Sequence, residues 1–209
     1  MMTISEKTTF WSATRQLLYC AGCFVMIFLE YAIAKIYKDR TFDENGIMEN
    51  LQLGELLFAC ALFCIIALRQ KTFTKLSLFF ASLCAFAACR EMDNLLDDRI
   101  PAVGWKIAFI FIAAAVIYAL KHWKCTREEL FKFLSHPSFI MMCFAVTTII
   151  PIAQCVGHKS FVINVLQMEH VGSIKEFIEE SIETIGYFIL LCSAVELLCH
   201  PNKQTGQES

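Results

Sequence analysis

The chain has 209 residues, of which 57% are hydrophobic and 18% are charged, and its formal net charge is −2 at pH 7. Soluble domains contain about 45–50% apolar and about 25% charged residues. This composition therefore excludes an ordinary water-soluble domain and favours an integral membrane protein.

Apolar segments of about 20 residues, each long enough to cross a bilayer core of about 30 Å, recur along the chain. They predict an all-α, polytopic membrane helix bundle with about six transmembrane helices. Residues 1–202 would then form a single transmembrane helical domain, and 203–209 a flexible tail. The predicted helices occupy residues 17–37, 50–68, 76–96, 102–123, 138–157 and 177–199.

The first segment also resembles a cleavable signal peptide, because Lys7 and Arg15 precede an apolar run. Its helical pattern continues through Ile36 and Tyr37, so we expect a permanent first helix.

The distribution of charge predicts the orientation. If the N-terminus lies inside, loops 69–75 and 121–136 lie in the cytoplasm and carry an excess of Lys and Arg, as the positive-inside rule requires. Most acidic residues then lie on the outer side. We expect a multi-pass protein of the cell membrane, in particular a bacterial inner membrane, with both termini in the cytoplasm. The lipid bilayer is the expected partner, and the acidic outer face argues against nucleic acid.

Local signals refine the helix ends and loops. Thr126 and Glu129 match a capping box that would open a short amphipathic segment at the inner interface. Pro137 is expected to start the fifth helix, and Pro151 to kink it near its outer end. The outer stretch 158–175 contains His158 and His170. The cysteines fall mostly in apolar runs, so we expect no structural disulfide.

Glutamates inside the apolar segments are the strongest functional signal. An ionised carboxylate in hydrocarbon costs at least ~2.5 kcal/mol. At a rise of ~1.5 Å per residue, Glu30 and Glu55 lie ~20 Å from the cytoplasmic boundary, and Glu91, Glu183 and Gln154 lie ~22 Å from it. The counting predicts one polar layer with a shared cation site, whose metal ligands would be Glu30, Glu55, Glu91, Glu183 and Gln154.

Other polar residues are expected to surround this layer. Arg90 should pair with one of the glutamates, because an unpaired charge at this depth is unfavourable. If the site is catalytic, Glu91, Glu183 and Glu179 are the candidates, with Glu179 as a base. The supporting residues would be Arg90, Gln52, Asn94, Asp98, Tyr187 and His158.

Carboxylate oxygens suit Mg²⁺, Mn²⁺ or Ca²⁺ better than Zn²⁺, which prefers His or Cys. Without a metal, clustered carboxylates would share protons. Three functions fit a carboxylate-lined cation site that opens to the outer side. The first is a metal-assisted enzyme at the outer leaflet, acting on a lipid. The others are a transporter coupled to a cation or proton, and a non-catalytic subunit with a structural polar layer. No recognised nucleophile or His-bearing motif decides whether the chain is an enzyme.

Overall fold

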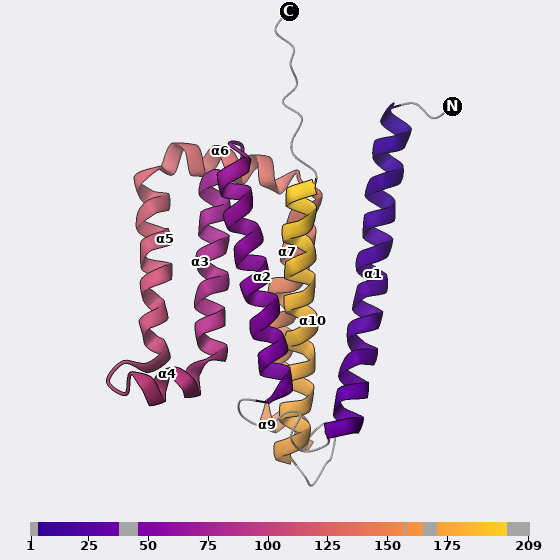
Figure 1. Cartoon of the computed structure of the whole chain (residues 1–209), viewed down its shortest axis with the longest axis vertical. Coiled ribbons are helices and arrows are strands. Elements are labelled where there is room, and N and C mark those ends of the chain that lie inside the picture. The colour runs from indigo at the N-terminus through magenta and orange to yellow at the C-terminus, as the bar shows by residue number, and fades with distance from the viewer. Residues whose placement is uncertain (1–3, 38–45, 157, 165–170, 200–209) are drawn as a thin grey trace, which may run out of the picture.

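The chain folds into a bundle of helices, seen in a computed structural model that describes residues 4–37, 46–156, 158–164 and 171–199. Every regular element in this described part is a helix, which confirms the all-α prediction. The long helices run side by side, while α6 crosses one end of the bundle and α4 lies at the other (Figure 1). The elements are α1 (Ile4–Tyr37), α2 (Ile47–Arg69), α3 (Thr74–Glu91), α4 (Asp93–Arg99), η2 (Gly104–Ala108), α5 (Phe109–Lys121), α6 (Trp123–Leu134), α7 (Pro137–Thr147), η3 (Thr148–Ile152), α8 (Ala153–Val156), α9 (Lys159–Asn164) and α10 (Val171–Cys199).

A multi-pass membrane protein is supported by five helical stretches that are long and apolar enough to cross a membrane. They correspond to the first, second, fourth, fifth and sixth predicted segments. The third predicted segment, 76–96, corresponds to α3, whose 18 residues include three charged side chains, Lys75, Arg90 and Glu91. Figure 1 shows α3 running alongside α2 and α5, and its crossing of the membrane stays a prediction. The five stretches are Thr9–Tyr37, Ile47–Arg69, Gly104–Lys121, Pro137–Val156 and Lys175–Cys199.

The predicted continuation of the third helix to residue 96 is wrong. α3 ends at Glu91, and Met92 leaves helical geometry with φ −105° and ψ 23°. The short α4 then starts in a new direction along the end of the bundle (Figure 1). Asp and Asn side chains bind nearby backbone groups and so compete with helix hydrogen bonds, as Asp93 Oδ1 does by accepting a 2.6 Å bond from Asn94 N.

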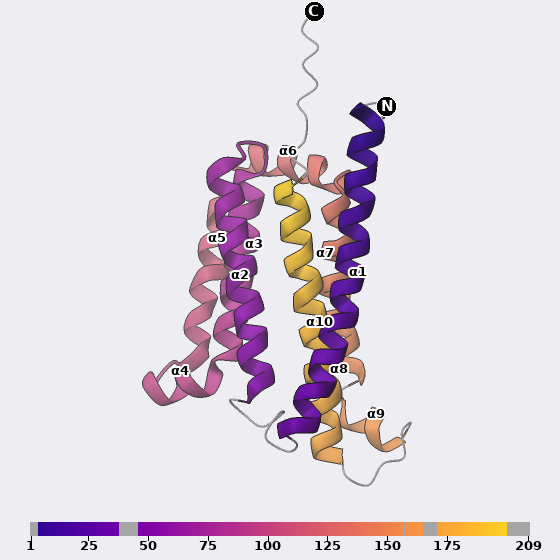
Figure 2. The same cartoon turned by 45° about the vertical axis from the view of Figure 1, so that its right-hand side comes forward.

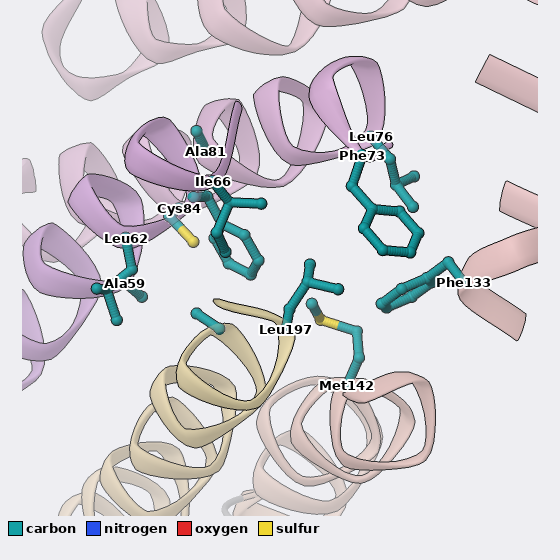
Figure 3. Close-up of a cluster of buried hydrophobic side chains, with 12 residues drawn as sticks. Ala59, Leu62, Ile66, Phe73, Leu76, Ala81, Cys84, Phe133, Met142 and Leu197 are labelled. Atoms are coloured by element: carbon teal, nitrogen blue, oxygen red, sulfur yellow. The ribbon is translucent and has the colours of Figure 1, made fainter. Parts of the chain in front are cut away.

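The buried core joins α2, α3, α6, α7 and α10 (Figure 3). Phe73 lies edge-on to Phe133 with ring centroids 6.5 Å apart, so the start of α3 packs directly on α6. In a bilayer, burial of apolar surface does not drive helices together, and close packing supplies most of the attraction. The buried members are Ala59, Leu62, Phe63, Ile66, Phe73, Leu76, Ala81, Cys84, Phe133, Met142, Ala194 and Leu197.

Small residues let α10 approach its neighbours closely. Ser138 Oγ of α7 donates to the backbone carbonyl of Ser193 at 2.7 Å, and Ser193 Oγ donates back to the carbonyl of Ser138 at 3.0 Å. A Cβ at Gly186 would lie 2.5 Å from Cγ1 of Ile149. Such contacts of small residues are a common way to bring membrane helices together. They place α10 in the middle of the bundle, where it contacts α1, α2 and α7.

The fifth predicted helix begins at Pro137, as expected. Around Pro151 the backbone changes to the π-helical turn η3, which interrupts the α-helix between α7 and α8. Proline removes one backbone donor and crowds the preceding turn, so the break lies where the sequence indicated. All eleven cysteines are free, in agreement with the expected absence of disulfides.

The predicted capping box at Thr126 and Glu129 is wrong. Helix α6 already begins at Trp123, and the Thr126 hydroxyl donates to the carbonyl of His122 at 3.2 Å. Glu129 instead accepts a 2.8 Å hydrogen bond from the backbone N–H of Leu76. This buried carboxyl group of α6 therefore caps the start of α3, whose own N-cap residue, Phe73, has no capping side chain.

Burial raises the pKa of Glu129, and the hydrogen bond from Leu76 opposes that rise. Because the folded-state pKa exceeds the unfolded-state value of about 4.3, Glu129 stabilises the fold most below that value. This contribution is lost as the pH rises through the folded-state pKa. Unfolding in detergent, measured from about pH 4 to about pH 8, should show the wild type losing stability relative to Glu129→Gln. Glu129→Ala, which loses the acceptor, should cost ~1 kcal/mol across the whole range. Equal pH dependence in the wild type and Glu129→Gln would contradict this account.

Gly104 is the first residue of η2, between α4 and α5, and its φ of +55° is unfavourable for residues with a Cβ. A Cβ there would also overlap Oδ1 of Asp97, the atom that accepts the Trp105 N–H at 3.2 Å. We expect Gly104→Ala to destabilise the protein by ~1–3 kcal/mol in thermal unfolding. Gly54→Ala is the matched control, since Gly54 is helical and a Cβ there would meet nothing within 4 Å. It should be neutral or slightly stabilising, and a similar loss in both variants would refute the steric explanation.

Candidate functional site

Arg90, near the end of α3, forms ion pairs with two glutamates. Its Nη2 atom lies 2.9 Å from Oε2 of Glu183 on α10 and 3.2 Å from Oε1 of the adjacent Glu91. Glu183 is 2% exposed, while the Arg90 side chain keeps 41% of its surface accessible. The predicted pairing of Arg90 with a glutamate of the polar layer is present in the structure, and it joins α3 to α10.

Further hydrogen bonds complete this group, which we call the Arg90 network. The Tyr187 hydroxyl donates to Glu91 Oε1 at 2.7 Å. Gln154 of α8 donates through Nε2 to Glu179 at 2.9 Å and to Glu183 Oε1 at 3.4 Å. Both oxygens of Glu183 therefore have a donor. The network consists of Arg90, Glu91, Gln154, Glu179, Glu183 and Tyr187, and Lys175 adds an ion pair of 2.9 Å to Glu179.

Gln52 belongs to a second polar contact, between α2 and α10. Its Nε2 atom donates to the Glu180 carboxylate at 2.8 Å and to the Thr184 hydroxyl at 3.1 Å. Its Oε1 atom is buried and has no hydrogen-bond partner among the described residues. Gln52 was predicted to support Glu55, but the structure turns its amide towards α10.

Glu30 and Glu55 form a separate pair. Glu30 of α1 is 5% exposed and Glu55 of α2 is 7% exposed. The Glu30 carboxyl group lies beside the hydroxyl of Ser181 on α10 and within electrostatic range of the Glu55 carboxyl group. Among the described residues, Glu30 Oε1, Glu55 Oε2 and Ser181 Oγ have no hydrogen-bond partner. Three helices thus contribute two buried carboxyl groups and one hydroxyl, and the Ser181 O–H is the only donor that these three side chains supply themselves.

The five predicted metal ligands consequently do not form one site. Glu91, Glu183 and Gln154 belong to the Arg90 network, whereas Glu30 and Glu55 make no hydrogen bond or ion pair with it in the described part of the chain. No group of three or more His, Cys, Asp or Glu side chains in that part is arranged to hold a metal ion. The prediction of a metal-binding protein is not supported.

Besides Gln52, three of the predicted supporting residues lie away from the Arg90 network. Asn94 and Asp98 belong to α4, beyond the break at Met92, so they no longer share a helix face with Glu91. His158 is exposed, and its Nδ1 accepts the backbone N–H of Ser160 at 3.2 Å. His170 lies outside the described residues.

One buried ion pair was not predicted from the sequence. Arg15 of α1 forms two 2.9 Å hydrogen bonds with the Glu196 carboxylate of α10, and the Tyr19 hydroxyl donates to the same carboxylate at 3.1 Å. Glu196 is fully buried. The signal that could have found it is its place within the last apolar segment, which is the same signal that identified Glu183.

In comparisons with known proteins, no family model, curated protein or solved structure matches the chain.

The Arg90–Glu183 pair yields a test of coupling. Removing one partner of a buried ion pair costs about 3–5 kcal/mol, because the other charge stays buried and unpaired. We expect Arg90→Gln to destabilise the protein by this amount in detergent unfolding. Adding Glu183→Gln should restore most of the loss, because two neutral amides can bond to each other.

The surface variant Arg99→Gln is the control for loss of an arginine charge, and its effect should stay within about 0.5 kcal/mol. If the losses from Arg90→Gln and Glu183→Gln simply add in the double variant, the two side chains are not coupled.

Proposed function

We propose that this chain is a multi-pass membrane protein that binds a small cation, either a proton or a monovalent metal ion, between α1, α2 and α10. We further propose that this binding is coupled to transport. The observation that supports the proposal is a group of buried oxygens whose hydrogen bonds are unsatisfied among the described residues, Glu30 Oε1, Glu55 Oε2 and Ser181 Oγ. We call this group the Glu30–Glu55 site.

Electrostatics gives the first reason. Two ionised carboxylates that are more than nine-tenths buried repel each other and have both lost their hydration. Burial of a charge is tolerated when an opposite charge or a hydrogen-bond donor replaces water. Arg90 does so for Glu183, whereas Glu30 and Glu55 have no cationic side chain in contact within the described residues. A proton or a metal cation would supply the missing charge.

The donor atoms indicate which cations fit. Two carboxylates and a hydroxyl are hard oxygen ligands, which suit alkali or alkaline-earth ions rather than softer metals. Divalent ions bind best where several carboxylates meet. Among the described residues, no three or more His, Cys, Asp or Glu side chains are arranged to hold a metal ion. A proton shared by the two carboxyl groups, or a monovalent ion bound by them, leaves one negative charge on the pair, to which the Ser181 hydroxyl can donate a hydrogen bond.

The position of α1 supports coupling to movement. α1 stands at the edge of the bundle, and its second half passes next to α10 (Figures 1 and 2). Glu30 is in that half, while the Arg15–Glu196 pair holds the first half. A shift of α1 against α10 would separate the oxygens of the site, so occupancy would favour one arrangement over the other.

The contacts of the Arg90 network bear differently on the two alternative functions, a metal-assisted enzyme and a non-catalytic subunit. In a metal-assisted enzyme, Glu91, Glu183 and Glu179 would need free oxygens, but these carboxylates already accept bonds from Tyr187, Arg90, Gln154 and Lys175. Such mutual saturation supports a structural role for the Arg90 network, which is the role expected of a non-catalytic polar layer. We therefore place cation binding at the Glu30–Glu55 site and helix locking at the Arg90 network.

We also propose that α3 crosses the membrane as the sixth span and that both termini face the cytoplasm, in a bacterial inner membrane. The start of α1, the end of α10 and the basic helix α6 lie at the same end of the bundle (Figures 1 and 2). Their shared end fits the excess of Lys and Arg expected on the cytoplasmic side.

The test uses purified protein in detergent and in proteoliposomes. Na⁺ or K⁺ should raise the unfolding temperature, or a shift to low pH should do so if the bound cation is a proton. A ligand at 100 times its Kd stabilises the folded state by ~2.7 kcal/mol. Glu55→Gln and Glu30→Gln should abolish this response and any cation-driven uptake. Each should be neutral or stabilising without the cation, because it removes an unpaired buried charge.

Glu128→Gln is the matched control, because it also removes one negative charge but at an exposed position on α6. It should keep the cation response of the wild type. A wild type whose stability depends on neither monovalent ions nor pH would sink the proposed function, as would an unchanged response in both Glu30→Gln and Glu55→Gln.

A further inference from the structure

An apolar cavity of about 260 Å³ lies beside the Arg90 network. Helix α5 packs against α3, and α7 packs against α10. The cavity lies where these two pairs of helices face each other, and α2 contributes Leu56 to it. Its wall includes Phe80, Phe86, Ile112, Met142 and Leu190. The partly exposed side chains Leu83, Val146 and Ile150 also line it, so it opens sideways towards lipid rather than along the bundle.

Besides the thiol of Cys84, the side chains of Arg90 and Tyr187 bring polar groups to the lining of this cavity. The Tyr187 hydroxyl is already donated to Glu91. Arg90 uses only Nη2 for Glu91 and Glu183, and its Nε and Nη1 groups have no acceptor among the described residues. These donors can be reached from outside the protein, because 41% of the Arg90 side chain is accessible. The Nε and Nη1 groups of Arg90 can therefore donate hydrogen bonds to an oxygen atom of a bound molecule.

We propose that this cavity binds a single-chain neutral amphiphile, with its apolar chain among the cavity side chains and a hydroxyl or carbonyl oxygen at Arg90. Binding sites for small molecules usually combine an apolar wall with a few polar groups that set the orientation. The geometry here supplies both, with the polar group at one end. The lateral opening gives access from the bilayer, where such molecules are dissolved.

Charge decides between a neutral and an anionic head. The single positive charge of Arg90 already faces the carboxylates of Glu91 and Glu183. An anionic head would enter a site whose positive charge is matched, and it would meet Glu183 at close range. A hydroxyl or carbonyl oxygen can accept a hydrogen bond from Arg90 without adding charge. A long-chain alcohol should therefore bind better than the fatty acid of equal chain length.

The experiment uses the full chain in lipid nanodiscs with a photoreactive long-chain alcohol that carries a diazirine in its chain. Crosslinks should map to α3 and α7, and unlabelled alcohol should compete for them. Ala87→Phe fills the cavity from α3, and Val146→Phe narrows its opening from α7. Each should reduce crosslinking at least several-fold. Ala113→Phe is the control, since Ala113 is exposed on α5 and does not line the cavity.

Arg90→Lys tests the polar end. Lysine keeps the positive charge for Glu183 but lacks the planar set of donors. Competition by the alcohol should weaken by roughly tenfold, the factor that corresponds to one hydrogen bond to a charged group. Glu55→Gln should leave crosslinking unchanged. This variant therefore distinguishes a wrong proposal for the Glu30–Glu55 site from a wrong proposal for the cavity.

Three results would overturn the proposal. The first is a lack of specific crosslinking in the wild type. The second is crosslinking in Ala87→Phe and Val146→Phe equal to that in Ala113→Phe. The third is stronger competition by the fatty acid than by the alcohol, which would show that the head is anionic. If Ala87→Phe does not fold, Val146→Phe alone decides, because its side chain lies at the open side of the cavity.

Discussion

The ion pair between Arg90 and Glu183 is the interaction on which the polar interior depends. It neutralises a carboxylate that is almost fully buried in α10, and it fixes the end of α3 against that helix. Gln154 and Tyr187 then have defined positions for their own hydrogen bonds. Because lipid offers no replacement partners, each of these side chains constrains the others. Because Arg90 and Tyr187 also line the neighbouring cavity, their positions in this network determine its polar end.

Helix α10 carries two different sites on neighbouring faces. Glu183 and Tyr187, one turn apart, face α3. Ser181 lies beside Glu30 of α1, while Thr184 accepts from Gln52 of α2. A single helix can meet three neighbours in this way because successive residues are turned by about 100° around its axis. The Arg90 network and the Glu30–Glu55 site therefore lie on different faces of α10 rather than at different depths along it.

That distinction explains how much of the structure could be predicted from the sequence. Counting residues from the ends of apolar segments identified Glu30, Glu55, Glu91 and Glu183 as buried, and it anticipated a partner for Arg90. Depth along a helix says nothing about rotation, so the same counting wrongly merged Glu30 and Glu55 with the Arg90 network. The end of α3 at Glu91 and the capping of α3 by Glu129 depend on contacts between distant segments, which a local pattern such as Thr126–Glu129 cannot reveal.

The contacts between α1 and α10 also bear on how the protein is made. The ribosome releases α1 first, and α10 is the last of these helices to leave it. Arg15 and Glu30 therefore enter the translocation machinery long before Glu196 and Ser181 exist to meet them. During that interval the ionisable side chains of Arg15 and Glu30 lack their partners on α10. Helix α1 can therefore form its contacts with α10 only after α10, the last of these helices, has been synthesised.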